Sequence, residues 1–173
     1  MQSAKFLNVI FAFCALRFAL KKMPGHSLAV IQYSEEGGFE FLLSKPHRSG
    51  AFVSGAQKLA QNFAAELLTQ RGSVRFDPSY GSRFPGELRG ANVISLDDLH
   101  GVLARGIHDV VTNIRGRERM TDTPDEMLAD AAITDLRQQL DRVIVAIRIV
   151  TEAGSSLVVR LPVELMENDH GRT

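Results

Sequence analysis

Two stretches of the chain repeat apolar residues at the spacing of an amphipathic helix. In the first, Leu59, Phe63 and Leu67 lie four residues apart, and polar residues occupy the other face. Because side chains four apart share one face of a helix, the pattern predicts a helix that begins near residue 56. Arg71-Gly72 predicts its end, since a cation favours the last helical turn and glycine the position just beyond it.

A second helix is predicted from Ser95 to about Arg117. Ser95 and Asp98 have the spacing of a capping box, in which each side chain bonds to the other residue's backbone N–H. Between the two helices, segment 73–90 is rich in Pro, Gly and Ser, so we expect turns there and no regular structure. The apolar face of the second helix consists of Leu96, Leu99, Leu103, Ile107, Val110, Val111 and Ile114.

The C-terminal part of the chain has the pattern of a β-hairpin. Val143–Thr151 is long and β-branched, which predicts a strand, and Ser156–Val163 predicts its partner across a tight turn at Gly154. Segment 129–138 fits either a short helix or a strand. A hairpin of this kind is marginally stable alone, so we expect it to pack on the helices.

The N-terminal part predicts a smaller β-hairpin. Leu28–Tyr33 and Phe39–Leu43 are short apolar runs on either side of a segment with two glycines, which supply the backbone conformation of a hairpin turn. Segment 44–55 holds Pro46 and several serines and glycines, which indicates a linker.

Phe6–Leu20 is almost wholly apolar, and three interpretations of it remain open. A signal or membrane anchor is one, although about 22 Å of helix is short for a bilayer core of ~30 Å and Arg17 interrupts the run. A helix buried against the domain or a partner is another. In the third, Met23 is the biological start and the segment is not part of the protein.

Composition and length limit the fold and the partners. The 173 residues suit one domain with an appendage, so we predict an N-terminal extension over 1–50, a main domain over 51–165 and a polar tail over 166–173. The predicted fold class is α+β, with two main helices packed on a small, mostly antiparallel sheet and an N-terminal helix and hairpin. Twenty basic residues balance twenty acidic ones, which gives no general attraction to nucleic acid.

The sequence predicts no catalytic residue, cofactor or metal site. It has neither a phosphate-binding glycine loop nor a G-x-S-x-G nucleophile turn, and the single cysteine, Cys14, excludes an internal disulfide. His100 and His108 stand two helical turns apart, too far to chelate one ion. The acid pairs Asp97-Asp98 and Asp125-Glu126 are adjacent in sequence and point in different directions, unlike the facing carboxylates of a glycosidase.

The predicted hairpin could bind another polypeptide chain through its backbone. A small sheet has open edges, and an open edge offers unpaired backbone groups to a strand of another chain. Strand addition by a partner and shielding of the edge by the chain's own tail are both open at this point.

Two short motifs favour strand addition. Leu68-Thr69-x-x-Gly72 is followed by Pro78-x-Tyr80-Gly81, then by a predicted helix and closing strands. This order resembles the sheath-initiator, or lysozyme-like baseplate wedge, family of contractile phage tails. Members of that family have a Leu-Thr-x-x-Gly turn and a Pro-x-aromatic-Gly loop between two helices. The resemblance covers residues 55–163.

The resemblance implies a structural protein of the virion, located in the tail baseplate and assembled in the host cytoplasm. Such a protein nucleates the first sheath ring by strand exchange, in six copies around the tail axis, and its partners are the tail sheath protein, other baseplate wedge proteins and the tail tube. No small-molecule substrate or nucleic acid is implied. Tyr80 is expected to pack against the helices, with Gly72 and Gly81 permitting the chain reversal. The strands expected to contact the sheath carry Val143, Val145, Ile147, Ile149, Leu157, Val158, Val159 and Leu161.

Two alternative functions come from other classes. A small hydrolase of cell-wall glycan would match the lysozyme-like label of some family members, but the missing carboxylate pair argues against that activity. A membrane-tethered adaptor would use the apolar segment 6–20 as its anchor.

Overall fold

The computed structural model describes residues 52–90, 95–119, 122–139 and 142–164, together with short strands at 27–28, 31–33 and 39–41. The expectations for the apolar N-terminal helix, for Cys14, for the start at Met1 or Met23 and for the tail over 166–173 lie outside the described residues.

A three-stranded antiparallel sheet forms one layer of the main domain. Its strands are β5 (Leu128–Gln139), β6 (Arg142–Thr151) and β7 (Ser156–Glu164), in the order β5-β6-β7. Strands β6 and β7 confirm the predicted hairpin, and Gly154 forms its turn with a φ of 83°. Segment 129–138, which fitted either structure, is a strand because pairing with β6 extends along nearly its whole length.

Two long helices form the second layer. They are α2 (Gly55–Leu67) and α4 (Leu96–Arg115), and the capping box of Ser95 and Asp98 is present at the start of α4 as predicted. Helix α2 ends four residues before the predicted Arg71. The reason is a short parallel bridge between Gln70 and Ser82, which draws the backbone out of the helix.

A short helix, α3 (Phe84–Gly90), lies in the segment where turns alone were predicted. That prediction was wrong because proline is compatible with the first turn of a helix, where its missing N–H has no partner to lose. The hydroxyl of Ser82 accepts a hydrogen bond from the Phe84 N–H at 3.2 Å, which starts the helix. A single 3₁₀ turn, η2 (Pro124–Glu126), precedes β5.

The N-terminal strands form two antiparallel pairs. Strand β2 (Ile31–Tyr33) pairs with β3 (Phe39–Phe41), which confirms the predicted hairpin. Strand β1 (Ser27–Leu28) pairs with β4 (Phe52–Val53), so the predicted linker over 44–55 contains a strand. The β1–β4 pairing joins the N-terminal extension to the main domain, and β2 lies close to α2 and β7.

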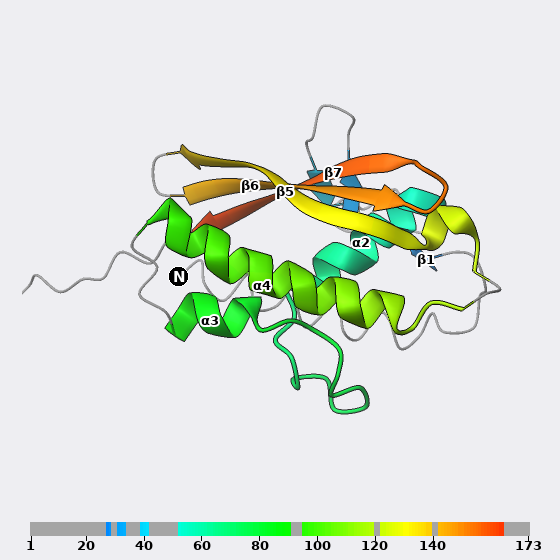
Figure 1. The fold of residues 1–173 in the computed structure, drawn as a ribbon, viewed down its shortest axis with the longest axis horizontal. Coiled ribbons are helices and arrows are strands. Elements are labelled where there is room, and N and C mark those ends of the chain that lie inside the picture. The colour runs from blue at the N-terminus through cyan, green and yellow to red at the C-terminus, as the bar shows by residue number, and fades with distance from the viewer. Residues whose placement is uncertain are drawn as a thin grey trace, which may run out of the picture.

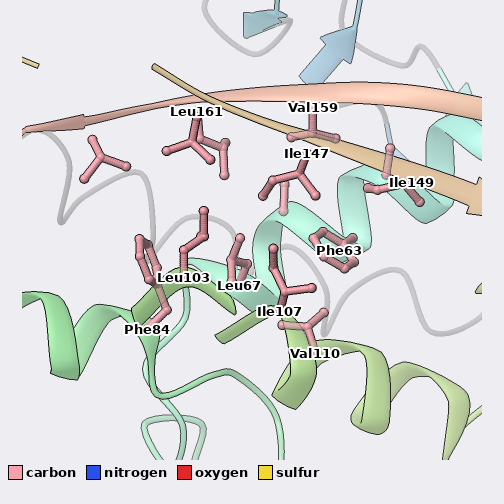
Figure 2. Packing of buried hydrophobic residues seen from close by; sticks show 14 of the residues in the cluster. Phe63, Leu67, Phe84, Leu103, Ile107, Val110, Ile147, Ile149, Val159 and Leu161 are labelled. Atoms are coloured by element: carbon pink, nitrogen blue, oxygen red, sulfur yellow. The ribbon is translucent and has the colours of Figure 1, made fainter. Parts of the chain in front are cut away.

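The core lies between one face of the sheet and helices α2 and α4, so the predicted α+β layering is confirmed (Figure 1). Figure 2 shows the side chains that fill this layer from both sides. They are largely aliphatic and come from the three helices and from two strands of the sheet: Phe63 and Leu67 of α2, Phe84 of α3, Leu103, Ile107 and Val110 of α4, and Ile147, Ile149, Val159 and Leu161 of β6 and β7.

Gly106 lets α4 approach its neighbours closely. A Cβ at this position would lie 2.6 Å from the Phe84 Cβ and 3.2 Å from the Leu67 Cδ1. Gly101, one and a half turns earlier in the same helix, is different, because its Cβ would meet only the Arg105 Nη1 at 3.7 Å.

These two glycines predict opposite effects of the same substitution. Gly106→Ala should lower the free energy of unfolding by about 1–3 kcal/mol, because overpacking against Phe84 exceeds the gain in helix propensity. Gly101→Ala should raise it by about 0.5–1 kcal/mol, since only the propensity term acts. Urea unfolding of both variants measures the difference, and equal effects would contradict the packing described here.

Candidate functional site: a sheet edge and a braced loop

The side chains predicted to contact the sheath lie mostly in the core. Val143, Val145, Ile147 and Ile149 of β6 are at most 1% exposed, and Val159 and Leu161 of β7 are also buried. Leu157 packs against the same cluster, and Val158 is half-buried in the alternate register, opposite Arg148. Because β6 is paired on both sides, a partner strand can reach only the backbone of β5 or β7.

Side chains from the end of α4 cover the start of β5. Arg115 donates hydrogen bonds from Nε to the Leu128 carbonyl at 3.2 Å and from Nη2 to the Ala129 carbonyl. A carboxylate oxygen of Glu118 accepts the Leu128 N–H at 2.5 Å. The backbone groups of Leu128 are therefore already used.

The remainder of β5 is irregular. Register shifts interrupt its pairing with β6 between Leu128 and Asp130 and again between Ile133 and Asp135. Asp135 and Arg137 form an ion pair at 2.5 Å on this strand. Bulges and charged residues are the usual means by which proteins protect an edge strand from pairing.

Strand β7 has a regular edge. Its register with β6 runs without interruption from Ser156 to Glu164. No other described strand is hydrogen-bonded to it, although β2 lies close to it. Pro162 lies in this strand, and a proline in an edge strand directs its nitrogen away from the ladder. Because N–H groups alternate in direction along a strand, the N–H groups of Val158 and Arg160 face the same outer edge.

Some of the motif residues lie at the base of the loop between α2 and α3. Leu68 caps α2 and packs on the core, and the hydroxyl of buried Thr69 donates to the Ala65 carbonyl at 2.6 Å. Gly81 has a φ of 102°, and a Cβ there would lie 2.6 Å from the Thr69 carbonyl oxygen. Only glycine fits this position. Gly72, with a φ of 81°, and Pro78 are exposed and lie away from the base.

The two arms of the loop are bonded to each other. The Arg71 N–H donates to the Ser82 carbonyl at 2.9 Å, and the Ser82 N–H donates to the Thr69 carbonyl at 2.9 Å. The buried Ser82 hydroxyl donates to the Leu67 carbonyl at 2.7 Å. These bonds satisfy the carbonyl that the end of α2 would otherwise leave without a partner.

Helix α4 holds the loop from one side. Tyr80 is 5% exposed, as predicted, and the Arg117 guanidinium carbon lies 5.4 Å from the centre of its ring. The Asn113 amide donates to the carbonyls of Ser79 and Gly81, both at 3.0 Å. The loop is therefore fixed at its base and on its C-terminal arm.

An ion pair joins the end of the loop to the middle of α4. Buried Asp109 accepts hydrogen bonds from Arg83 Nε and Nη2, each at 2.8 Å, and from the Arg83 N–H at 3.1 Å. Donation from the Arg83 side chain lowers the pKa of Asp109, and its backbone N–H and charge add to the shift. The same carboxylate raises the pKa of Arg83.

Asp77 has a similar role within the loop. The Ser79 hydroxyl donates to it at 2.6 Å, and this bond is the main cause that lowers the pKa of Asp77. The charge of Arg117, 3.8 Å away, lowers it further.

The tip of this loop is open to solvent. Phe76 is 74% exposed, and the Arg75 guanidinium carbon lies 5.9 Å from its ring centre. Figure 1 shows the loop extending from the helices on the side away from the sheet. A rigid base with an exposed aromatic tip is a common form of protein-binding loop.

The bracing residues of α4 and of the turn just after it were not predicted from the sequence, although a signal was present. Asp109, Asn113 and Arg117 lie four residues apart and form one polar line beside the apolar face. Arg115, in the last turn of α4, bonds to strand carbonyls, and Arg117, just beyond the helix, pairs with Glu66. His100 and His108 are exposed on α4, as expected for a polar helix face.

The chain was compared with protein-family models, curated proteins and solved structures, and none of them matches it. Within the described ranges, no helix has both the length and the apolar character that crossing a membrane requires.

The Arg83–Asp109 pair predicts a pH dependence of stability. Since folding lowers the pKa of Asp109 from about 3.8, the pair stabilises the fold above that pH, and the stabilisation is lost as pH falls through the folded-state pKa. Asp109→Asn should lower the free energy of unfolding at pH 7 and reduce its decline between pH 5 and 2. Urea unfolding across this range measures both effects, with the exposed Glu152→Gln as control. An unchanged pH profile would contradict the assignment.

Proposed function

We propose that the chain is a structural baseplate protein that nucleates tail-sheath assembly in a contractile phage tail or related injection system. In this proposal it is not an enzyme. The observation that carries it is the unbroken outer edge of β7, in a sheet whose other edge is covered and interrupted. The order of the Leu68–Gly72 and Pro78–Gly81 motifs, which resembles the sheath-initiator family, supports it.

Strand addition to β7 would proceed through the backbone. A sheath strand would accept and donate hydrogen bonds along residues 156–161, and Pro162 would mark the end of the paired segment because it lacks an N–H. Side chains of β7 on the face away from the helices, such as Val158 and Arg160, would fix the register. Repetition around a six-fold ring would strengthen each modest contact.

The loop between α2 and α3 supplies a second contact in this proposal. Its base is held by Asn113 and Arg117, so Phe76 is presented without a large loss of conformational freedom on binding. We assign this tip to a neighbouring wedge or tube protein, because it extends away from the sheet that would receive the sheath strand (Figure 1).

The acidic residues weighed for a hydrolase have structural partners. Asp98 caps α4, Asp125 accepts a hydrogen bond from the Ser155 hydroxyl at 3.1 Å, and Glu126 pairs with Lys58. These partners support a structural role for the acid pairs. The membrane adaptor depends on residues 6–20, which lie outside the described part of the chain.

A proline at position 158 tests the β7 edge. Val158→Pro removes one outward N–H and leaves the ladder with β6 intact, whereas Val158→Ala removes only side-chain atoms. We expect Val158→Pro to abolish nucleation of the sheath protein encoded in the same genome, and Val158→Ala to retain it. Electron microscopy of sheath polymers formed with each variant is the measurement.

Hydrogen exchange on the unmodified chain gives an independent test, which also applies if the proline variant does not fold. Addition of sheath subunits should slow exchange at the N–H group of Val158. Normal nucleation by Val158→Pro, or no change in exchange, would refute the β7 edge as the contact. A genome without a sheath gene would refute the function itself.

A further inference from the structure

The tip of the loop between α2 and α3 carries the most exposed large apolar side chain of the described residues. Phe76 is 74% exposed, whereas Leu96, the next such side chain, is 36% exposed. Figure 1 shows the loop on the side of the helices away from the sheet, and so away from the β7 edge. A single exposed apolar side chain is common on protein surfaces, but the backbone and the charges around Phe76 distinguish this one.

Two successive hydrogen-bonded turns fix the backbone of the tip. The Asp77 N–H donates to the Val74 carbonyl, and the Tyr80 N–H donates to the Asp77 carbonyl, both at 3.1 Å. Arg75 and Phe76 are the two central residues of the first turn. Because these bonds are already made in the free chain, a partner that binds Phe76 has little backbone to order.

The tip has an excess of positive charge. Arg71 and Arg75 are exposed, and neither forms an ion pair with another described residue. The Asp77 carboxylate accepts the Ser79 hydroxyl at 2.6 Å and lies 3.8 Å from the Arg117 guanidinium. The charge of Asp77 is therefore compensated within the protein, and the two exposed arginines are left to attract an acidic surface.

Arg75 and Phe76 form one recognition unit. The Arg75 guanidinium carbon lies 5.9 Å from the centre of the Phe76 ring, within the range of a cation–π contact. A guanidinium group stacks through its face and donates hydrogen bonds from its edge, so it can contact a ring and a carboxylate together. The matching surface is apolar where it meets the ring and carries a carboxylate beside it.

These features favour a protein over a polyanion as the partner. The chain has as many acidic as basic residues, so it lacks the general positive charge with which proteins bind nucleic acid or anionic lipid. Single-stranded nucleic acid is usually bound along a groove with several stacking rings, and the tip has one. Asp77, whose pKa the Ser79 hydrogen bond lowers, is negatively charged at neutral pH and would repel phosphate groups.

We propose that Phe76 inserts into an apolar pocket of a partner protein, and that Asp or Glu side chains at the rim of this pocket pair with Arg71 and Arg75. The proposal gives the chemistry of the second contact described above. It rests on the proposed function only for the identity of the partner, a wedge or tube protein. A sheath strand on β7 leaves the tip accessible, because the loop extends away from the sheet (Figure 1).

Photo-crosslinking from position 76 identifies the partner. The full chain, with p-benzoylphenylalanine in place of Phe76, is irradiated in cells that express the proteins of the same genome. Mass spectrometry of the product should show a partner peptide that contains or adjoins both apolar and acidic residues. A product with a second copy of this chain, with nucleic acid or with lipid would overturn the proposal, and so would the absence of a specific product.

Titration calorimetry with the purified partner then tests each part of the tip. Phe76→Ala should weaken binding about thirtyfold, and Phe76→Leu, which keeps an apolar side chain, about threefold. Arg75→Glu should weaken binding about tenfold at low salt and less at high salt, because salt screens the attraction. Arg148→Glu is the matched control, since Arg148 is exposed on the outer face of the sheet, and it should leave the affinity unchanged.

The tip proposal and the proposed function fail in different ways. Unchanged affinity in Phe76→Ala or in Arg75→Glu would overturn the tip proposal and leave strand addition at β7 untouched. An acidic partner that shows the expected losses but is not a tail protein would support the tip proposal and refute the function. Both side chains are exposed, so the variants should unfold at the same temperature as the unmodified chain.

Discussion

The apolar contact between the sheet and helices α2 and α4 determines which part of the backbone a partner can reach. Side chains such as Val145 and Ile147 point into this contact and are fully buried, so β6 is fixed in the centre with both of its neighbours. The helices cover one face of the sheet, and of its edges α4 covers only the start of β5 through Arg115. Only the edge strands β5 and β7 can therefore offer backbone groups to a partner, and the two strands are not equally accessible.

Helix α4 contacts three parts of the molecule, namely the core, the loop between α2 and α3, and the edge strand β5. Its apolar face packs into the core, where Gly106 allows contact with Phe84. The line of Asp109 and Asn113 holds the loop, and the end of the helix contributes Arg115 to the cover of β5. A change in the position of α4 would consequently alter the core, the loop and the β5 edge together.

Local patterns predicted the elements whose stability depends on their own residues. Helix α4 has a capping box and an apolar face in its own sequence, and β6 is a continuous β-branched run, so both could be identified. Strand β5 could not, because its alanines and aspartates have little strand propensity and its conformation comes from pairing with β6. The end of α2 depends on Ser82, which lies 15 residues beyond Leu67 in the chain.

In the candidate site, too, local features could be predicted from the sequence, and features that depend on distant contacts could not. Burial of Tyr80 was expected from the family resemblance, and the unusual backbone conformation of Gly81 from local turn chemistry. Strands β6 and β7 were predicted, but the burial of Val143 and Ile149 depends on which face the helices cover.

The difference between β5 and β7 limits how copies of this chain can associate with one another. If two copies met edge to edge, β7 would pair with β7 around a two-fold axis, and each would then present only its covered and bulged β5. A sheet with one edge available for pairing can bind only one other strand at a time. Self-association by this route ends at a dimer and does not continue into a fibril.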